Sequence, residues 1–326
     1  MKNYIGVDVS KQTLDVFDGS LSYTVPNEKG MKTWKKILKK QFGKDWDQIQ
    51  LIYEPTGPYS LALRSFCQVN QIQAYEVNPK KSANFAKVLG NRSKTDKVDA
   101  KLLYSFQGMV LPESFTVPTN QPIIEQLKIL FCSYEMIQKA RIMLSNHLES
   151  QTISVIVPAS TTAFFDKEIQ RLQEKEDLLL VEMIQIIRQE ESLDEEYQCL
   201  TSMPGVGPLL GITFLYFFHH YPQANRAQIV ALAGLDPTRR ESGTSVKHKM
   251  KISKAGFKFL RKTMYFACMS SIQYNDRIKL FYERLLKNHK PKKVALIACM
   301  KKMVLISHQL FLKKEMFHGL EVVKKL

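Results

Sequence analysis

The sequence predicts an α/β domain at the N-terminus, followed by all-α regions that extend to the C-terminus. Three observations lead to this fold class. Short apolar runs alternate with helix-length segments over the first 118 residues, in the order β-β-β-α-β-α-β. Between 119 and 200 apolar residues recur at spacings of three and four, and helix patterns continue through 201–326. We therefore expect three domains, 1–118, 119–200 and 201–326.

The first strand is expected at Asn3–Val9, whose sequence N-Y-I-G-V-D-V is mostly apolar and suits burial on both faces. Gly6 would clear space beside Asp8, which ends the strand. An unpaired carboxylate in apolar surroundings loses its hydration, so Asp8 either meets a cation or caps the following turn. Both interpretations stay open on this stretch alone.

Two further strands, Thr13–Phe17 and Ser22–Val25, are joined by Asp18-Gly19, a strong hairpin turn signal. Asn27 is predicted to cap the next helix. An apolar strand then follows at Gln50–Tyr53 and ends in Glu54, which places a second carboxylate at a strand end.

A helix over about 59–69 and a strand over 73–77 complete the sheet, and Asn78-Pro79 opens another helix that ends near Leu89. In R-S-K-T-D-K-V-D-A, Thr95 is the expected N-cap of a further helix. Asp96 would lie in its first turn, with Asp99 on the same face. Acids at a helix N-terminus also simply complement the helix dipole, so this pair alone identifies no site.

Four acids thus lie at the ends of predicted elements. Asp8 and Glu54 end two strands, and Asp96 and Asp99 lie at the start of one helix. This arrangement in a β-β-β-α-β-α-β domain resembles the ribonuclease H superfamily, in particular its RuvC-like nuclease branch. Clustered carboxylates repel one another, and Mg²⁺ relieves the repulsion because it prefers hard oxygen ligands. Two Mg²⁺ ions about 4 Å apart can clamp the attacking and leaving oxygens of a phosphodiester.

The middle region predicts two long helices joined by a bend at Pro158-Ala159-Ser160. Only Arg141 interrupts the apolar stripe of the first helix, and only Glu176 interrupts that of the second. We expect an antiparallel coiled-coil hairpin that pairs with another subunit, giving a dimer or tetramer. The alternative is that both helices pack on their own domain. The stripes are Ile123, Leu127, Leu130, Tyr134, Ile137, Leu144 and Leu148, and Phe165, Ile169, Leu172, Leu179, Met183 and Ile186.

The C-terminal region begins with T-S-M-P-G-V-G-P-L-L-G, which resembles the turn of a helix-hairpin-helix element. Gly205 and Gly207 would let backbone amides approach a phosphate. A basic stretch follows at 247–262, predicted to contact phosphates, with a solvated charged face as the alternative. Its candidate contacts include Lys247, Lys249, Lys251 and Lys254.

Composition supports a polyanionic partner, because 47 Lys and Arg against 31 Asp and Glu give a net charge of +16. Nucleic acid is the leading candidate. The five cysteines are scattered without a C-x-x-C pair, which indicates neither a zinc site nor a disulfide framework. With no signal peptide and no continuous apolar run of membrane-spanning length, we expect a cytoplasmic protein that does not use the membrane.

Seven short motifs, taken together and in this order, resemble the DEDD transposases of bridge-RNA-guided insertion sequences. They are Y-I-G-V-D, Y-E-P-T-G, K-T-D-K-V-D-A, M-P-G-V-G-P, A-G-L-D-P, R-R-E-S-G and S-K-A-G. Pilin-gene invertases are similar. The resemblance implies a RuvC-like domain joined through a coiled coil to a C-terminal transposase domain. It also implies DNA substrates, a guide RNA, metal-binding acids at Asp8, Glu54, Asp96 and Asp99, and a nucleophilic serine at Ser242.

From the residues alone, Ser242 before a glycine is typical of an ordinary turn, and its assignment as nucleophile comes from the resemblance. Arg239 and Arg240 lie two to three residues before it and suit bidentate contact with a phosphate. The sequence departs from the family pattern at two places. Pro55 stands where many relatives carry a small residue, and Lys247-His248-Lys249 replaces a shorter basic-glycine pattern. Neither departure touches a proposed catalytic group.

The sequence therefore predicts an RNA-guided, site-specific DNA recombinase that cuts and rejoins strands through a phosphoserine intermediate. A RuvC-like, Mg²⁺-dependent junction nuclease that uses water as its nucleophile is the main alternative. A sugar-kinase or actin-like ATPase would also carry G-V-D-V-S near its start, but it should contain a second glycine-rich phosphate loop, and none is present. An inactive nucleic-acid-binding scaffold would not need four aligned acids.

Overall fold

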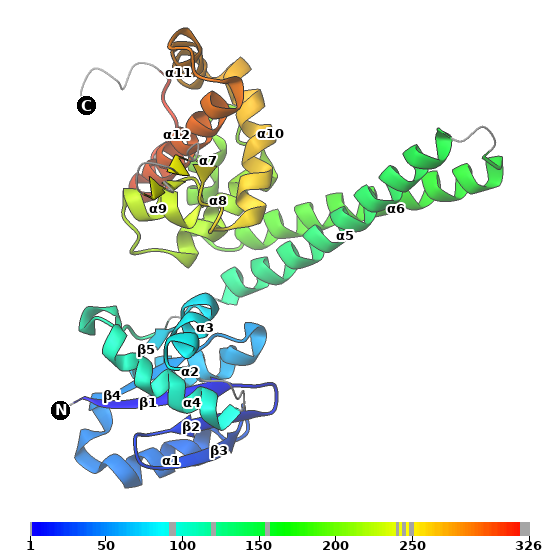
Figure 1. Ribbon diagram of the computed structural model, residues 1–326. Helices are drawn as coiled ribbons and strands as arrows, with labels where there is room; N and C mark the ends of the chain where they lie inside the picture. Colours follow the sequence, from blue (N-terminus) through cyan, green and yellow to red (C-terminus); the bar gives the residue numbers. More distant parts are fainter. Residues whose placement is uncertain are drawn as a thin grey trace. The chain divides into compact units, whose positions relative to one another are not determined.

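The computed structural model describes residues 2–90, 96–118, 122–153, 157–238, 241–242, 246–247 and 251–319. The chain forms two compact units, Met1–Gln121 and Pro122–Leu326 (Figure 1). The first unit is α/β and the second is dominated by helices, so the predicted succession of an α/β region and helical regions is confirmed.

The first unit is built on a five-stranded sheet with the strand order β3-β2-β1-β4-β5. The central strand β1 pairs antiparallel with β2 and parallel with β4, and β4 pairs parallel with β5. All five predicted strands are present, within one residue of their expected ends. Their bounds are β1 Asn3–Val9, β2 Thr13–Phe17, β3 Ser22–Pro26, β4 Ile49–Tyr53 and β5 Gln73–Glu76.

Helices cover both faces of this sheet, because alternate side chains of a strand point to opposite sides. On one face, Val7 and Leu51 pack with Trp34 of α1 and Phe66 of α2. On the other face, Ile52 packs with residues that include Leu103 of α4, alongside Phe85 of α3. The helices are α1 Met31–Phe42, α2 Leu61–Val69, α3 Pro79–Val88 and α4 Asp96–Ser105, with short 3-10 helices at Gly43–Gln48, Gly57–Ser60, Phe106–Met109 and Pro112–Ser114.

The predicted N-cap at Asn27 is wrong, because α1 begins after Gly30 and no side chain caps it. Asn27 is buried, and its Nδ2 donates to the carbonyl oxygens of Ser10 and Tyr59, at 2.9 Å each. Two carbonyl acceptors satisfy this buried amide, which would be costly to leave unpaired. Asn27 therefore connects the turn after β1 to the short 3-10 helix before α2.

The second unit starts with two long antiparallel helices, α5 (Pro122–Thr152) and α6 (Ala159–Ile187) (Figure 1). The predicted bend is present, since α6 begins directly after Pro158. The two polar interruptions of the apolar stripes meet each other. Arg141 Nε lies 2.5 Å from Glu176 Oε1, and the Glu176 side chain is only 2% exposed. A buried ion pair of this kind fixes which turns of the two helices face each other.

The apolar stripes are mostly used within the hairpin and at its base. Leu127 is fully buried, and Leu130 packs on the core of the second unit. A separate row on α5 stays exposed at seven-residue spacing, at Ile129, Met136 and Met143, which are 62–67% accessible. Pairing with another subunit stays a prediction, and this row is the surface on which it would occur.

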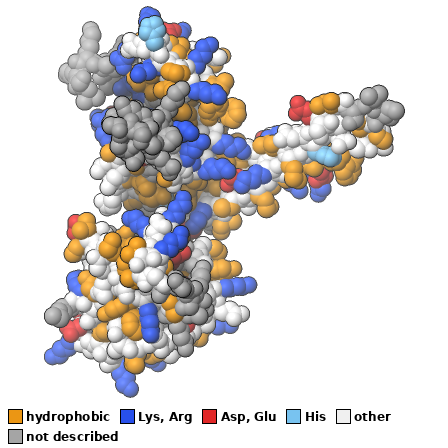
Figure 2. All heavy atoms as spheres, in the orientation of Figure 1, with side chains coloured by type: hydrophobic (Ala, Val, Ile, Leu, Met, Phe, Trp, Pro, Cys, Tyr) orange, Lys and Arg blue, Asp and Glu red, His pale blue; other side chains and the backbone are white. Residues whose placement is uncertain are grey.

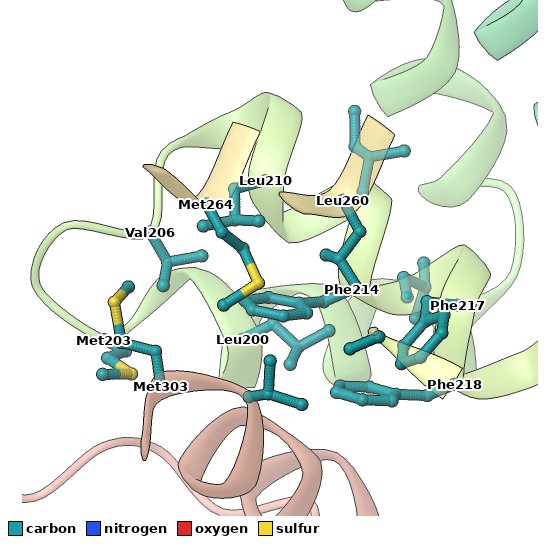
Figure 3. Packing of buried hydrophobic residues seen from close by; sticks show 14 of the residues in the cluster. Leu200, Met203, Val206, Leu210, Phe214, Phe217, Phe218, Leu260, Met264 and Met303 are labelled. Carbon is teal, nitrogen blue, oxygen red and sulfur yellow. The ribbon is translucent and has the colours of Figure 1, made fainter. Parts of the chain in front are cut away.

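Helices α7, α10 and α12 pack on α8, whose Phe214, Phe217 and Phe218 are buried in the core (Figure 3). Met203, Met264 and Met303 reach the same core from the α7–α8 turn, α10 and α12. The helices are α7 Glu191–Thr201, α8 Pro208–His220, α9 Arg226–Leu232, α10 Lys258–Tyr274, α11 Asp276–Lys287 and α12 Lys292–Lys313. By length and composition α12 could cross a membrane, but half of the apolar window is buried inside the fold, as in the core helix of a globular domain.

The ion pair between Arg141 and Glu176 yields a test of hairpin stability. Changing Glu176 to Gln removes the charge that neutralises the half-buried Arg141, so we expect the hairpin to lose about 1–3 kcal/mol of stability. Amide hydrogen exchange along α5 and α6 measures this loss locally. Glu168→Gln, in an exposed pair with Arg171 at 3.5 Å, is the matched control and should cost less than about 0.5 kcal/mol. Equal protection in both variants would contradict a role for the buried pair.

Candidate metal centre and nucleic-acid interface

Helix α4 lies directly on β1 at Gly6. A Cβ atom at Gly6 would stand 2.1 Å from the carbonyl oxygen of Ala100 and 2.4 Å from the amide nitrogen of Tyr104. Side chains never come so close to backbone, so only glycine lets the helix sit here. The expectation that Gly6 clears space is confirmed, but the space is filled by the backbone of α4.

Asp8 and Glu54 come together at neighbouring strand ends. Val7 of β1 is the register partner of Tyr53 in the parallel strand β4. Asp8 directly follows Val7, and Glu54 directly follows Tyr53. Asp8 is two residues beyond Gly6 and therefore points to the same face, toward α4. The carboxyl ends of two parallel strands thus carry two carboxylates side by side.

A hydroxyl from the neighbouring helix holds Glu54. Ser82 of α3 is buried and donates its hydroxyl hydrogen bond to Glu54 Oε2. Its position follows from the start of α3, where Asn78 Oδ1 accepts from the amide of Lys80 at 3.0 Å. The sequence analysis did not identify Ser82, because nothing in a helical K-K-S-A segment marks a contact with a distant strand.

A further acid faces the same side of the sheet. Asp15 of β2 is the register partner of Asp8, is buried, and accepts a hydrogen bond from Thr24 Oγ1 at 2.7 Å. Carboxylates directly opposite each other repel, and a cation between them lowers that cost. The sequence analysis missed Asp15, since a lone acid within an apolar strand shows nothing of its cross-strand partner.

The predicted helical acids lie at the start of α4, as expected. Asp96 is its first residue, although its side chain lies outside the described part of the structure, and Asp99 is half-buried one turn later. Among the described residues, no three His, Cys, Asp or Glu side chains are grouped closely enough to hold a metal ion. The carboxylate and hydroxyl oxygens present are the donors that Mg²⁺ takes. The donor chemistry therefore fits the ion, with Asp96 as the remaining carboxylate of the predicted four.

The acid at the end of the third parallel strand has a different role. Glu76 of β5 accepts from the Tyr53 hydroxyl at 2.5 Å and from Arg64 at 2.7 and 2.9 Å. Burial, and then the charge of Glu76, raise the pKa of Tyr53. Tyr53 belongs to the core on the face of the sheet that α1 and α2 cover, whereas Asp8 points to the opposite face. Glu76, which bonds to Tyr53, therefore has a structural role and lies away from Asp8.

The candidate nucleophile lies in a narrow β-stranded arm. Strand β6 (Pro237–Thr238) pairs with β9 (Lys251–Ile252), and β7 (Glu241–Ser242) pairs with β8 (Val246–Lys247). The backbone of Ser242 is opposite Val246. The side chains of Ser242, Arg239, Arg240, Lys247 and Lys249 lie outside the described part, so their predicted roles are carried forward as proposals.

Two motifs of the sequence form the base of this arm. Gly234, from A-G-L-D-P, and Gly256, from S-K-A-G, pack so closely that a Cβ on Gly256 would stand 1.6 Å from the carbonyl oxygen of Leu232. The Ser253 hydroxyl donates to Asp236, and Arg261 donates to the carbonyls of Ala233 and Lys254 at 3.0 Å each. The arm that carries Ser242 is therefore anchored at its base by close backbone contacts and by side-chain hydrogen bonds.

The two glycines in the turn between α7 and α8 have different structural roles. Gly205 has φ of +94°, and a Cβ there would clash with Ser271 of α10, so this glycine is needed for packing. Gly207 precedes α8 with open space at its Cβ position. Both border a cleft of about 740 Å³ that Lys262 and Phe266 also line. Contact of either glycine with nucleic acid stays a prediction.

Of the four lysines named as candidate phosphate contacts, Lys251 and Lys254 have described side chains, and both are exposed. Lys251 lies in β9, at the base of the arm, and Lys254 follows it in the left-handed conformation, with φ of +53°. The Lys254 amide donates to the carbonyl of Gly234 at 3.2 Å, so backbone contacts hold this lysine beside the arm. Both ammonium groups are available to a phosphate.

Comparisons with known proteins agree with the motifs. The DEDD family of IS110 elements, described as Transposase, matches residues 5–155, and the family described as Transposase IS116/IS110/IS902 matches residues 197–283. The Pilin gene-inverting protein of Moraxella bovis is 25% identical over 316 residues, which cover 94% of this chain and 95% of the relative. The protein of the same name from Moraxella lacunata is 25% identical over 314 residues, with the same coverage.

The contact at Gly6 predicts a strict requirement for glycine. Gly6→Ala should lower the stability of the first unit by at least about 2 kcal/mol, because the methyl group meets helix backbone that cannot move aside. Both tryptophans of the chain, Trp34 and Trp46, belong to this unit, so urea unfolding followed by tryptophan fluorescence reports it selectively.

Gly108→Ala is the matched control, since nothing lies within 4 Å of a Cβ at that position. It should leave the urea midpoint nearly unchanged. If Gly6→Ala unfolds at the wild-type urea concentration, α4 does not depend on this contact for its place on the sheet.

Proposed function

We propose that this chain, which carries the two domains of IS110-family transposases and is a DNA transposase or recombinase, cuts and rejoins DNA through an ester between Ser242 and a DNA phosphate. The observation that carries the proposal is the pairing of Asp8 and Glu54 at adjoining ends of β1 and β4, under a helix that begins with Asp96. The β-β-β-α-β-α-β order of the first unit supports assigning it to the RNase H-like, RuvC-like folds.

Dependence on a divalent metal follows from the DEDD family. We infer that the ion is Mg²⁺, held as one or two ions by Asp8, Glu54, Asp96 and Asp99. Bound there, it would neutralise charge on the phosphate and lower the pKa of a coordinated hydroxyl. The residues of the chain orient the ligands: Ser82 fixes one carboxylate of the set, and the contact at Gly6 fixes the helix that supplies two others.

In the proposed step, Ser242 Oγ attacks the scissile phosphorus. The Oγ–P bond forms while the bond from phosphorus to the leaving deoxyribose oxygen breaks, the hydroxyl proton leaves to solvent, and the leaving oxygen takes up a proton. Arg239 and Arg240 would hold the phosphate oxygens during this step. The hydroxyl end of a second strand then attacks the phosphoserine and releases Ser242. The number of ester bonds is conserved, so no energy-supplying cofactor is needed.

Rejoining is favoured over simple hydrolysis by the curated relatives. They are described as gene-inverting proteins, and inversion of a DNA segment requires that every cut end be joined again. We infer a guide RNA as a partner because the motifs resemble those of bridge-RNA-guided transposases. Its backbone would add to the phosphates that a chain of net charge +16 can bind.

The proposal includes a homo-oligomer, a dimer or tetramer, that assembles through the hairpin. The row formed by Ile129, Met136 and Met143 leaves apolar surface in water at a regular heptad spacing. A second copy of the hairpin would cover it. Strand exchange between two DNA sites also needs two active serines, which an even-numbered assembly supplies.

Removal of the Ser82 hydroxyl tests the metal centre. Ser82→Ala frees Glu54 from its orienting bond, so the affinity for Mn²⁺ should fall about 10-fold or more, with the fold retained. Calorimetric titration of the protein with Mn²⁺ measures this affinity without any need for activity. Ser105→Ala removes a hydroxyl bonded only within its own helix and should leave the affinity unchanged. Equal affinities in the two variants would exclude Glu54 as a metal ligand held by Ser82.

The decisive test of the reaction is the covalent intermediate. Ser242→Ala should bind DNA with wild-type affinity, since it removes one neutral oxygen, yet form neither recombinant product nor a protein–DNA adduct on a denaturing gel. Ser245→Ala, three residues along the sequence, is the control and should be mild. If Ser242→Ala still cleaves DNA at the wild-type rate, water is the nucleophile, and the junction-nuclease alternative replaces this proposal.

A further inference from the structure

Arg277, Arg284 and Lys302 form a cluster of cations on α11 and α12, and two of them lie over the ring of Phe281. Arg277, Phe281 and Arg284 are spaced four and three residues apart, so they share one face of α11. The guanidinium carbon of Arg284 lies 5.2 Å from the centroid of the Phe281 ring, and Lys302 Nζ of α12 lies 4.4 Å from it. The attraction of the ring for cations offsets only part of the repulsion between them.

This cluster has no acidic partner within the described part of the chain. None of the ion pairs found there includes Arg277, Arg284 or Lys302. Burial lowers the pKa of Lys302, and the charges of Arg277 and Arg284 lower it further. Like charges held together in this way cost stability in the absence of an anion.

The surroundings reinforce the positive charge. Residues 276–293 contain seven Lys and Arg against two Asp and Glu. Helix α12 begins with Lys292 and Lys293 and has no acidic residue in its first turn. Lysines at a helix N-terminus oppose the helix dipole, so this placement does not serve helix stability. Lys and Arg side chains are visible in the region of α11 in Figure 2, interspersed with side chains of other kinds.

We propose that Arg277, Arg284 and Lys302, with the lysines that open α12, form a binding site for the phosphate backbone of duplex DNA, separate from the basic stretch at 247–262. The inference rests on the proposed action on DNA. Duplex backbone is the occupant that we infer, because the site offers charge and because two cations already cover Phe281, which leaves no free ring on which an unpaired base could stack.

The proposal makes opposite predictions for stability and for binding. The triple variant R277Q/R284Q/K302Q removes the mutual repulsion, so its melting temperature in phosphate-free buffer should equal or exceed that of the wild type. Inorganic phosphate should raise the melting temperature of the wild type more than that of the variant. If the three cations instead stabilise the fold, the variant will melt at a lower temperature, which overturns the proposal.

Binding to a 30-base-pair duplex of arbitrary sequence supplies the second measurement. The slope of log affinity against log salt should become shallower by about 2 to 3 in the triple variant, close to 0.9 for each lost phosphate contact. K32Q/K36Q/K40Q, three exposed lysines of α1, is the control of equal charge change and should alter the slope much less. Equal changes in both triple variants would mean a general effect of net charge and would overturn a specific site.

These measurements separate the failure of this site from the failure of the proposed reaction. Neither needs catalysis, so they hold whether or not Ser242 forms an ester with DNA. Repeating the titration with a single-stranded RNA of the same length tests the choice of occupant. If the triple variant loses affinity for RNA but not for the duplex, the site binds a different nucleic acid from the one proposed.

Discussion

The contact between Gly6 and the backbone of α4 is the constraint on which the rest of the candidate metal centre depends. Two acids end neighbouring parallel strands, and two others open a helix that is distant in sequence. Only close approach of that helix to the central strand can bring the two pairs to one edge of the sheet. A side chain at position 6 would meet main-chain atoms of Ala100 and Tyr104, so glycine is a geometric requirement there. The position of α4 on the sheet depends on this contact, and the proposed metal site would depend on it in turn.

The proposed metal ligands and the proposed nucleophile lie on structural elements of different kinds. The acids are attached to a five-stranded sheet with a core on each face, which suits metal ligands that must be held in fixed positions. Ser242 is carried by short strand pairs whose base is anchored at Gly234, Gly256 and Asp236. Reactive groups are commonly carried by segments that extend from a rigid scaffold. An arm of this kind therefore suits the proposed nucleophile, which would be joined to DNA and later released.

Much of this architecture could be predicted from the sequence because it depends on local patterns. Strand and helix periodicity located all five strands and the bend at Pro158, and the acids at the strand ends followed from the same reading. What could not be predicted were pairings between distant residues. The Arg141 to Glu176 pair appeared only as two separate interruptions, Ser82 and Asp15 had no local signal, and Asn27 was assigned to a helix cap when it bonds two distant carbonyls. The sequence analysis did not single out Arg277, Phe281 and Arg284, because their approach to Lys302 depends on the packing of α11 on α12.

The central claim is that the Gly6 contact brings Asp8, Glu54 and the start of α4 together around a divalent ion. Anomalous diffraction from crystals soaked in Mn²⁺ tests it most directly, because the signal locates the metal independently of any activity. The account predicts one or two strong peaks at the carboxyl ends of β1 and β4, about 2.1 Å from carboxylate oxygens of Asp8 and Glu54 and reached also by Asp96 or Asp99. A Mn²⁺ peak elsewhere on the chain, with none at these strand ends, would contradict it.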